Sequence, residues 1–187
     1  GFFKRSLVES CVVNDNKAIL DNNEETIIFD AVTKGNPRAK YVYGIDPASE
    51  KDNFCIVVLE LRANHSRVVH VWTTNKTNFK DRQKTGLVNE HDFYGFCARK
   101  IRDLMKVFPA ERIGIDAQGG GIAIEEALHD PSRLQGGEEL IWPTVDYDGK
   151  GKDTDSQPGL HILEMVQFAK ADWTAQANHG LRKDMED

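Results

Sequence analysis

Two short apolar stretches that each end in an aspartate decide the fold of this chain. The first is Tyr41-Val42-Tyr43-Gly44-Ile45-Asp46, and the second is Arg112-Ile113-Gly114-Ile115-Asp116. Short runs of this kind, bounded by turn-forming residues, indicate buried strands. Where two such strands lie side by side, their ends bring Asp46 and Asp116 together at one edge of a sheet.

The segments around these two stretches predict the rest of the sheet. Residues 54–61 and 67–74 are rich in β-branched and apolar residues, and the joins between them are short and polar. Together with residues 41–46 they predict an antiparallel meander of three strands. Residues 140–145 predict a fifth strand.

Three helices are expected between and after these strands. In residues 90–107 the apolar side chains recur at steps of three and four, which makes one helical stripe. A turn of three glycines leads into a second helix over residues 122–129, and a third is expected over residues 160–178. The polar residues 75–85 are expected to form a loop. This order predicts an α/β, ribonuclease-H-like mixed sheet of three antiparallel strands and then parallel strands, with helices on both faces.

Residues 1–40 lack this periodicity, and breakers such as Gly35-Asn36-Pro37 interrupt them. We expect them to form a linker or an N-terminal extension, with an ordinary N-terminal subdomain as the alternative. Residues 41–187 then form one domain, a size that a single hydrophobic core supports.

The composition is that of an ordinary globular protein. Of its 187 residues, 40% are hydrophobic and 29% are charged, and no apolar run is long enough to span a bilayer. No secretory signal is visible. Three widely spaced cysteines without CxxC pairs predict reduced, buried thiols in a cytosolic setting, and count against disulfides or a zinc site.

The net charge of −6 and the pI near 5.5 count against a dedicated nucleic-acid-binding protein, because contact with phosphates favours basic surfaces. An enzyme that collects carboxylates to hold metal ions lowers its own pI, however. We therefore expect any affinity for DNA to come partly from another domain.

The two strand-end aspartates predict a metal site. Crowding like charges is unfavourable, and a divalent cation removes that cost. Carboxylate oxygens suit Mg²⁺ or Mn²⁺, and two such ions roughly 3.5–4 Å apart can hydrolyse a phosphodiester bond. Asp46 is expected to bridge the ions and Asp116 to hold one of them. The alternative for each residue is an aspartate that only starts a turn or caps a helix.

Several segments resemble the nuclease domain of tailed-bacteriophage terminase large subunits. Residues 44–49, followed by residues 52–53, resemble its first catalytic strand, and residues 113–121 resemble the second, where an acidic residue precedes a glycine-rich turn. Residues 1–7 resemble the linker that leaves the packaging ATPase, and residues 177–184 resemble a late stretch of some members. The resemblance implies a ribonuclease-H-like, metal-dependent endonuclease that cuts concatemeric viral double-stranded DNA in the cytoplasm of the infected host cell.

The resemblance also implies partners and a further metal ligand. The partners are a small terminase subunit, a portal ring and an upstream ATPase domain, with no membrane involved. This chain carries no G-x-x-x-x-G-K-[ST] phosphate loop, so ATP-driven translocation does not reside in it. The family places a third acidic ligand near the C-terminus. We expect that ligand to lie beyond Asp187, in a chain truncated at its C-terminus, with Asp184 or Asp187 as alternatives.

Other residues are weaker candidates for the site. Asp52 can support the metal through water or cap a turn, and Gly120 can let phosphate approach the backbone or form a tight turn. His179 is a candidate catalyst or a surface residue. Basic side chains in two loops are candidates for DNA contact, although such loops are usually only solvated: Lys76, Lys80, Arg82, Lys84, Lys150 and Lys152. Asp146 and Asp148 can extend the acidic site or form a turn.

Three other functions compete with this one. A sugar kinase or actin-like ATPase would need a Gly-Thr-rich turn after the first aspartate, where this chain has Pro47-Ala48-Ser49. A ribonuclease H or junction resolvase would have the same fold and a different substrate. A catalytically silent DNA-binding or assembly module would fit the acidic composition and the absence of a third ligand.

Overall fold

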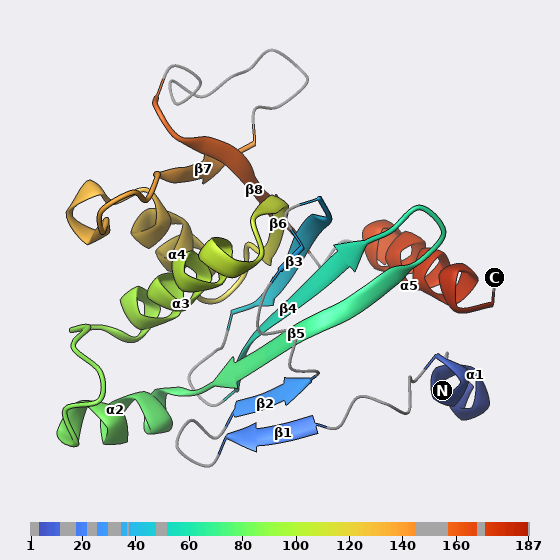
Figure 1. Ribbon diagram of the computed structural model, residues 1–187, viewed down its shortest axis with the longest axis horizontal. Helices are drawn as coiled ribbons and strands as arrows, with labels where there is room; N and C mark the ends of the chain where they lie inside the picture. The colour runs from blue at the N-terminus through green and yellow to red at the C-terminus, as the bar shows by residue number, and fades with distance from the viewer. Residues whose placement is uncertain are drawn as a thin grey trace.

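The computed structural model describes residues 4–11, 18–21, 26–29, 35–36, 38–47, 52–144, 157–167 and 171–186. A mixed sheet forms the centre of this part of the chain (Figure 1). Its strands are β3 (Lys40–Asp46), β4 (Phe54–Leu61), β5 (Ser66–Thr74), β6 (Ala110–Asp116), β7 (Ile141–Pro143) and β8 (Leu160–Val166). They lie side by side in the order β5-β4-β3-β6-β8-β7.

The pairing of the strands confirms the predicted mixed sheet. β4 pairs antiparallel with both β3 and β5, whereas β6 pairs parallel with β3 and with β8, and β8 pairs parallel with β7. The strands β3, β5, β6 and β8 therefore all point the same way, and their carboxyl ends reach the same edge of the sheet. We call this the carboxyl edge.

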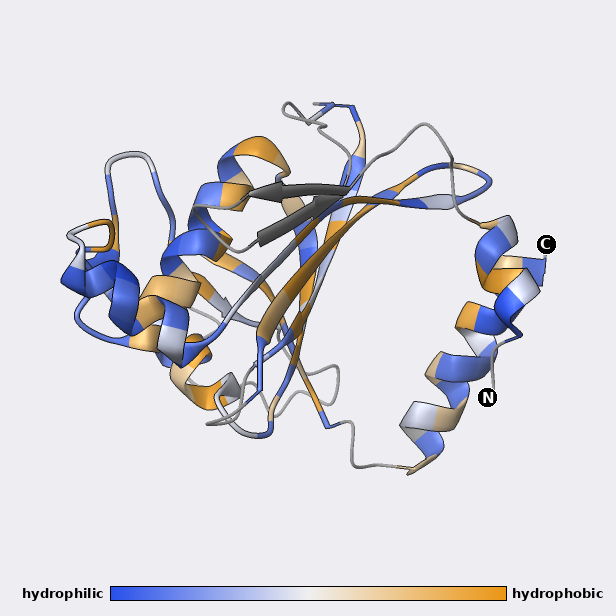
Figure 2. Cartoon of the chain, turned by 90° about the horizontal axis from the view of Figure 1, so that it is seen from below, coloured by the Kyte–Doolittle hydropathy of each residue, from blue (hydrophilic) through white to orange (hydrophobic). Residues whose placement is uncertain are grey.

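Helices lie on both sides of the sheet, as predicted. Seen in Figure 2, α2 (Lys76–Lys84), α3 (Phe93–Val107) and α4 (Gly121–Leu128) lie on one side, and α1 (Arg5–Ser10) and α5 (Ala171–Glu186) lie on the other. A short 3-10 helix, η1 (Pro131–Arg133), follows α4. In the described part of the chain, no helix combines the length and the apolar character that crossing a membrane requires.

The hydrophobic core fills the space between the sheet and the helices α2, α3 and α4. Alternate residues of β3 point into it, so that Tyr41, Tyr43 and Ile45 are at most 3% exposed. On the helical side, α3 contributes one apolar stripe that includes Cys97 and Ile101. We call this side of the sheet its covered face and the other side its open face.

The helix α2 corrects the sequence prediction, which expected a loop over residues 75–85. Its nine residues include one buried apolar side chain, Phe79, so no apolar stripe announces a helix. The helix begins at a side-chain cap, because the amide nitrogen of Asn78 donates to Oδ1 of Asn75 at 2.9 Å. Phe79 then anchors α2 by ring contacts with Phe93 and Phe96 of α3.

The segment that follows residue 159 is a second correction. A single helix was expected over residues 160–178, but residues Leu160–Val166 form β8 and the helix α5 begins at Ala171. A short apolar run fits a buried strand as well as a helix. Hydrogen bonding to β6 on one side and β7 on the other decides for a strand.

The N-terminal region holds three short elements, the helix α1 and the antiparallel pair β1 (Ala18–Asp21) and β2 (Thr26–Phe29). β2 contacts β5 of the main sheet, and α1 contacts α5. The boundary between an extension over residues 1–40 and a domain over residues 41–187 stays a prediction. All three cysteines are free thiols, but Cys11 is exposed, so the expectation that all three are buried is wrong.

Candidate metal centre

Asp46 and Asp116 end neighbouring parallel strands at the same level. Ile45 of β3 pairs with Ile115 of β6, and each aspartate is the next residue. Hydrogen-bonded strands lie about 4.8 Å apart, so the two carboxylates start from adjacent backbone positions. Because Ile45 and Ile115 point into the core, both aspartate side chains point to the open face.

A groove of about 580 Å³ begins at these aspartates on the open face. It is lined by residues of four strands, among them Gly44, Asp46, Cys55, Val57, Gly114, Asp116 and Val166. Gly44 and Gly114 face each other across β3 and β6, where a Cβ on Gly44 would meet no other atom within 4 Å. The groove is therefore hollow because two paired positions next to the aspartates carry no side chain.

The electrostatics of the pair are those of crowded carboxylates. Burial raises the pKa of Asp46, and the negative charges of Asp116 and Asp52 raise it further. Asp52 therefore lies close enough to act on Asp46, while its support of a metal through water stays a prediction. A divalent cation between such groups would favour their charged forms.

Asp116 is held in place by its own turn. One carboxylate oxygen, Oδ1, accepts a hydrogen bond from the backbone amide of Gln118 at 3.0 Å. The backbone amide of Ala117, the residue directly after Asp116, donates to the carbonyl of Val166 at 2.7 Å and extends the pairing of β6 with β8. Asp116 therefore starts a turn, which was the alternative reading of this residue, and the same hydrogen bond fixes the direction of its carboxylate at the groove.

The glycines after Asp116 are required by close packing. Gly119 has a φ of +61°, a left-handed conformation that favours glycine. A Cβ on Gly120 would lie 2.3 Å from the ring of Tyr94, and a Cβ on Gly121 would lie 2.0 Å from the carbonyl oxygen of Asp116. These contacts account for the glycine run without a ligand, and a phosphate-binding role for Gly120 stays a prediction.

The number of carboxylates limits which metals fit. Within the described ranges, no group of three or more His, Cys, Asp or Glu residues is placed to hold a metal ion. A closed cage of protein ligands is thus not formed by these residues. Two carboxylates on an open groove do fit Mg²⁺ or Mn²⁺, which keep several water ligands and take others from a substrate phosphate.

The remaining predicted site residues that the structure describes lie on the helices α5 and α2. His179 and Asp184 belong to α5, which contacts α1 (Figure 2). Asp184 is not among the residues whose charge raises the pKa of Asp46, which are Asp116 and Asp52. Lys80 and Arg82 lie on α2. Four predicted residues and one proposed ligand fall outside the described residues: Lys150, Lys152, Asp146, Asp148 and Asp187.

Two features of the site were not foreseen from the sequence. Cys55 pairs with Asp46 across β3 and β4 and lines the same groove, where burial and the charge of Asp46 raise the pKa of its thiol. The predicted meander placed some residue of the second strand opposite Asp46, but the sequence did not determine the register of the two strands and therefore did not identify Cys55. Tyr94, which packs on Gly120, is the second, and it lies outside the apolar stripe that predicted the helix.

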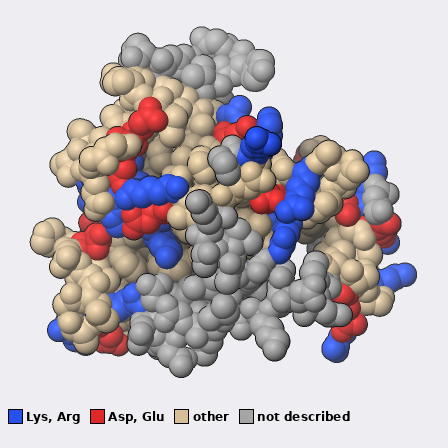
Figure 3. Space-filling view, viewed as in Figure 1, with Lys and Arg blue, Asp and Glu red and all other residues tan. Residues whose placement is uncertain are grey.

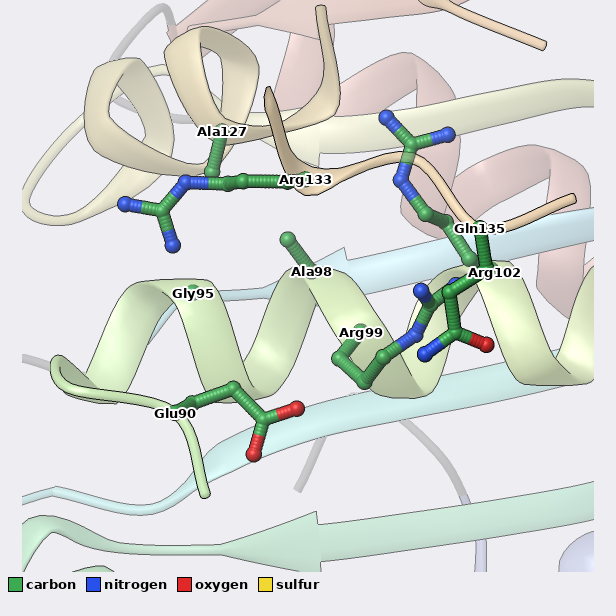
Figure 4. A pocket seen from close by; sticks show the side chains of 8 residues that line it. All are labelled: Glu90, Gly95, Ala98, Arg99, Arg102, Ala127, Arg133 and Gln135. Atoms are coloured by element: carbon green, nitrogen blue, oxygen red, sulfur yellow. The ribbon is translucent and has the colours of Figure 1, made fainter. Parts of the chain in front are cut away.

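A smaller cavity of about 180 Å³ lies beside α3 and does not have the character of a binding site (Figure 4). Three arginines line it and point in different directions. Arg102 donates to the carbonyls of Leu128 and Glu139, and Arg99 pairs with Glu138. Arg133 pairs with Asp92 and Asp130. These arginines therefore hold α3 to the segments that follow α4.

Comparison with known proteins gives one kind of likeness. No protein-family model and no curated protein sequence matches the chain. Among the solved structures that match is the crystal structure of the large terminase nuclease from thermophilic phage G20c, with a TM-score of 0.51 and 14% sequence identity. The match covers 86% of this chain and 60% of that one. At this identity the likeness shows a shared fold.

Proposed function

We propose that this chain is a divalent-metal-dependent endonuclease that hydrolyses phosphodiester bonds of double-stranded DNA. The observation that carries the proposal is the meeting of Asp46 and Asp116 at the end of an open groove, on adjacent parallel strands. Burial, together with the negative charges of Asp116 and Asp52, raises the pKa of Asp46 and supports the proposal, since a bound cation would favour the charged form of the carboxylate. The likeness of fold to a phage terminase nuclease supports it independently.

The residues of the groove have distinct roles in this proposal. Asp46 ends the central strand β3 and is the proposed bridging ligand, and Asp116 is the proposed ligand of one ion. Two divalent ions held by these residues would supply activation of the attacking water and stabilisation of the leaving oxygen. Asp116 is held in one orientation by the amide of Gln118, and Gly44 and Gly114 leave room for the sugar–phosphate backbone.

The biological setting that we propose is the packaging of a viral genome. In that setting the enzyme cuts concatemeric DNA in the cytoplasm of the host cell, as a terminase large subunit does together with a small subunit, a portal ring and an ATPase domain. The chain spans 60% of the length of the solved nuclease that it matches, so the activity and the partners of a whole terminase are part of this proposal.

A nicking assay on supercoiled plasmid DNA with Mn²⁺ tests the proposed site. We expect the wild-type protein to nick the plasmid, and we expect Asp46→Asn or Asp116→Asn to lower the rate by at least about 100-fold, because each removes a metal ligand. Asp103→Asn is the matched control, since Asp103 is an exposed aspartate of α3 that pairs with Lys106. Nicking that survives Asp46→Asn would refute the assigned site.

Cleavage assays with Mn²⁺ on duplex DNA, an RNA–DNA hybrid and a four-way junction separate the competing functions. A ribonuclease H would prefer an RNA–DNA hybrid over duplex DNA, and a resolvase would prefer a four-way junction. A silent binding module is favoured by the presence of only two convergent carboxylates among the described residues. Such a module would bind DNA and show no Mn²⁺-dependent nicking. The wild-type protein alone therefore decides between a nuclease and a silent module.

A further inference from the structure

Tyr94 packs on the glycine turn that follows Asp116, at the carboxyl edge of the sheet. Its ring and hydroxyl lie against Gly120, because a Cβ on Gly120 would be 2.7 Å from its Cζ and 2.8 Å from its hydroxyl oxygen. Gly120 is the N-cap residue of α4, and the following glycine packs on the carbonyl of Asp116. The Tyr94 hydroxyl therefore lies beside the turn that carries Asp116.

Lys76 places a positive charge beside that tyrosine. Its ammonium group lies 5.7 Å from the centroid of the Tyr94 ring, within the range of a cation–π contact. The position of Lys76 is set by the preceding residue, Asn75, whose side-chain amide donates to Oδ1 of Asn53 at 3.1 Å. Asn53 in turn follows Asp52, the carboxylate whose charge acts on Asp46. The hydrogen bond between Asn75 and Asn53 therefore holds Lys76 at the carboxyl edge of the sheet, near the segment that carries Asp52.

The first turn of α2 carries a charge that is unfavourable for the helix, whereas Arg82 and Lys84 lie in the last turn, where cations are stabilising. The helix carries four basic residues and one acidic residue, and its first turn has Lys76 but no acidic side chain. The N-terminal end of a helix is its positive pole, where a cation is destabilising and an anion is stabilising. Lys76 and Lys80 also repel each other as like charges four residues apart.

We infer that Lys76 and Tyr94 form a phosphate-binding subsite that holds the DNA strand at a phosphate near the one that is cut. This inference rests on the proposed nuclease function. The Lys76 ammonium and the Tyr94 hydroxyl are both hydrogen-bond donors to phosphate oxygens. The strand crosses the carboxyl edge from the groove on the open face to α2 on the covered side.

Beyond Lys76, the strand continues along α2. Lys80 follows one turn later, about 6 Å along the helix axis, and is exposed. Figure 3 shows basic side chains over α2, at the lower left of the view. Lys80 is therefore the next phosphate contact, and α2 sets the direction in which the bound strand leaves the site.

The salt dependence of DNA binding tests the subsite without requiring cleavage. Binding of a fluorescent duplex is measured with Ca²⁺ in place of Mn²⁺, over a range of salt concentrations. The slope of log K against log salt is negative, and losing one phosphate contact reduces its magnitude by about 0.9. At 0.1 M salt this corresponds to an affinity that is about 8-fold weaker. We expect this change for Lys76→Gln, about twice this change in slope for Lys76→Gln combined with Lys80→Gln, and an unchanged slope for Lys76→Arg.

Lys40→Gln is the matched control, because Lys40 is an exposed lysine at the opposite end of β3, where it pairs with Glu111. Tyr94→Phe keeps the ring on Gly120 and removes the hydroxyl, and is expected to raise the KM for Mn²⁺-dependent nicking while the slope stays as in the wild type. Circular dichroism of each variant establishes that it is folded, and Lys80→Gln alone replaces Lys76→Gln if that variant is not.

The possible outcomes separate this inference from the function on which it rests. Wild-type nicking together with equal slopes for Lys76→Gln and Lys40→Gln would overturn the subsite and leave the nuclease standing. A wild-type protein that does not nick DNA with Mn²⁺ would overturn the nuclease, and the subsite with it. Nicking together with a slope lowered by Lys76→Gln but not by Lys40→Gln would support both.

Discussion

The two faces of the central sheet are built from the same strands and differ in what their side chains do. Along β4, Phe54, Ile56 and Val58 point to the covered face and are fully buried, while Cys55 and Val57 between them are half-buried on the open face. The covered face holds the core, and the open face holds two aspartates, two glycines and a groove. A single strand therefore contributes to stability with one set of residues and to the candidate site with the other.

The largest expected effect comes from breaking the covered face. Ile56→Ala removes a fully buried side chain and leaves a cavity, so we expect the free energy of unfolding to fall by about 2–5 kcal/mol. The adjacent Val57→Ala trims a half-buried side chain at the groove and is expected to cost about 1 kcal/mol. Urea unfolding followed by circular dichroism measures both. Equal losses would mean that the two faces are equally packed.

The residues that form the covered face also made the sheet predictable from the sequence. Strands such as β4 and β6 announce themselves by apolar runs between polar turns, and α3 by a stripe at helical spacing. Elements whose identity depends on distant partners could not be predicted in this way. α2 has one anchoring side chain, Phe79, and β8 is a strand because β6 and β7 flank it.

The open face was predictable only in part. An aspartate at the end of each of two strands, with the strands expected to be neighbours, predicted that Asp46 and Asp116 would converge. The parallel register of β3 and β6, which places them at the same level, is a property of the folded sheet. The same is true of Cys55 and Tyr94, because their nearness to the site depends on cross-strand register and on the packing of α3 over Gly120.

A second prediction concerns the stability effect of the open-face aspartate, whose sign depends on metal. Burial and neighbouring charge raise the pKa of Asp46, so its ionised form lowers the free energy of unfolding at pH values above that pKa. Without metal at neutral pH, Asp46→Asn is therefore expected to raise the melting temperature. At Mn²⁺ concentrations about 100 times the dissociation constant, the wild-type protein gains about 2.7 kcal/mol, and the variant gains much less.

Thermal denaturation with and without Mn²⁺ measures this reversal, and EDTA should restore the metal-free order. A gain of about 2.7 kcal/mol corresponds to a rise of roughly 5–11 °C for a chain of this size. In metal-free protein, the advantage of Asp46→Asn should disappear as the pH falls through the raised pKa, because the wild-type carboxyl is then neutral as well. An Mn²⁺ shift of equal size in both proteins would show that Asp46 binds no metal.

Alkylation of Cys55 gives a third, independent reading of the open face. Its thiol lines the groove next to Asp46, so bound Mn²⁺ is expected to slow its reaction with iodoacetamide several-fold by restricting access. The measurement uses Cys11→Ser, which removes the exposed thiol, while Cys97 is buried in the core. Adding Asp46→Asn to this background should abolish the protection. Protection that persists in the double variant would place the ion away from the aspartate pair.

The smallest expected effect comes from the covered face and has the opposite pH dependence to that of Asp46. Burial, with a contribution from the positive charge of Lys100, lowers the pKa of His70 from 6.5 to about 4. Between these two values the unfolded chain binds a proton that the folded protein does not, so stability is lost as the pH falls from 6.5 towards 4. Water still reaches part of this ring and screens the charge, so the expected loss is about 1 kcal/mol.

His70→Phe removes the proton-binding group and keeps an aromatic ring beside Phe108, which lies 5.9 Å from His70 between ring centroids. Urea unfolding at pH 7 and at pH 4.5 should show a smaller loss of stability for this variant than for the wild-type protein. His65→Asn, in the exposed turn between β4 and β5, controls for the loss of a histidine as such. If the free energy of unfolding of His70→Phe depends on pH as that of the wild type does, His70 binds its proton equally well in the folded and unfolded protein. Burial on the covered face would then not disfavour the charged form of His70.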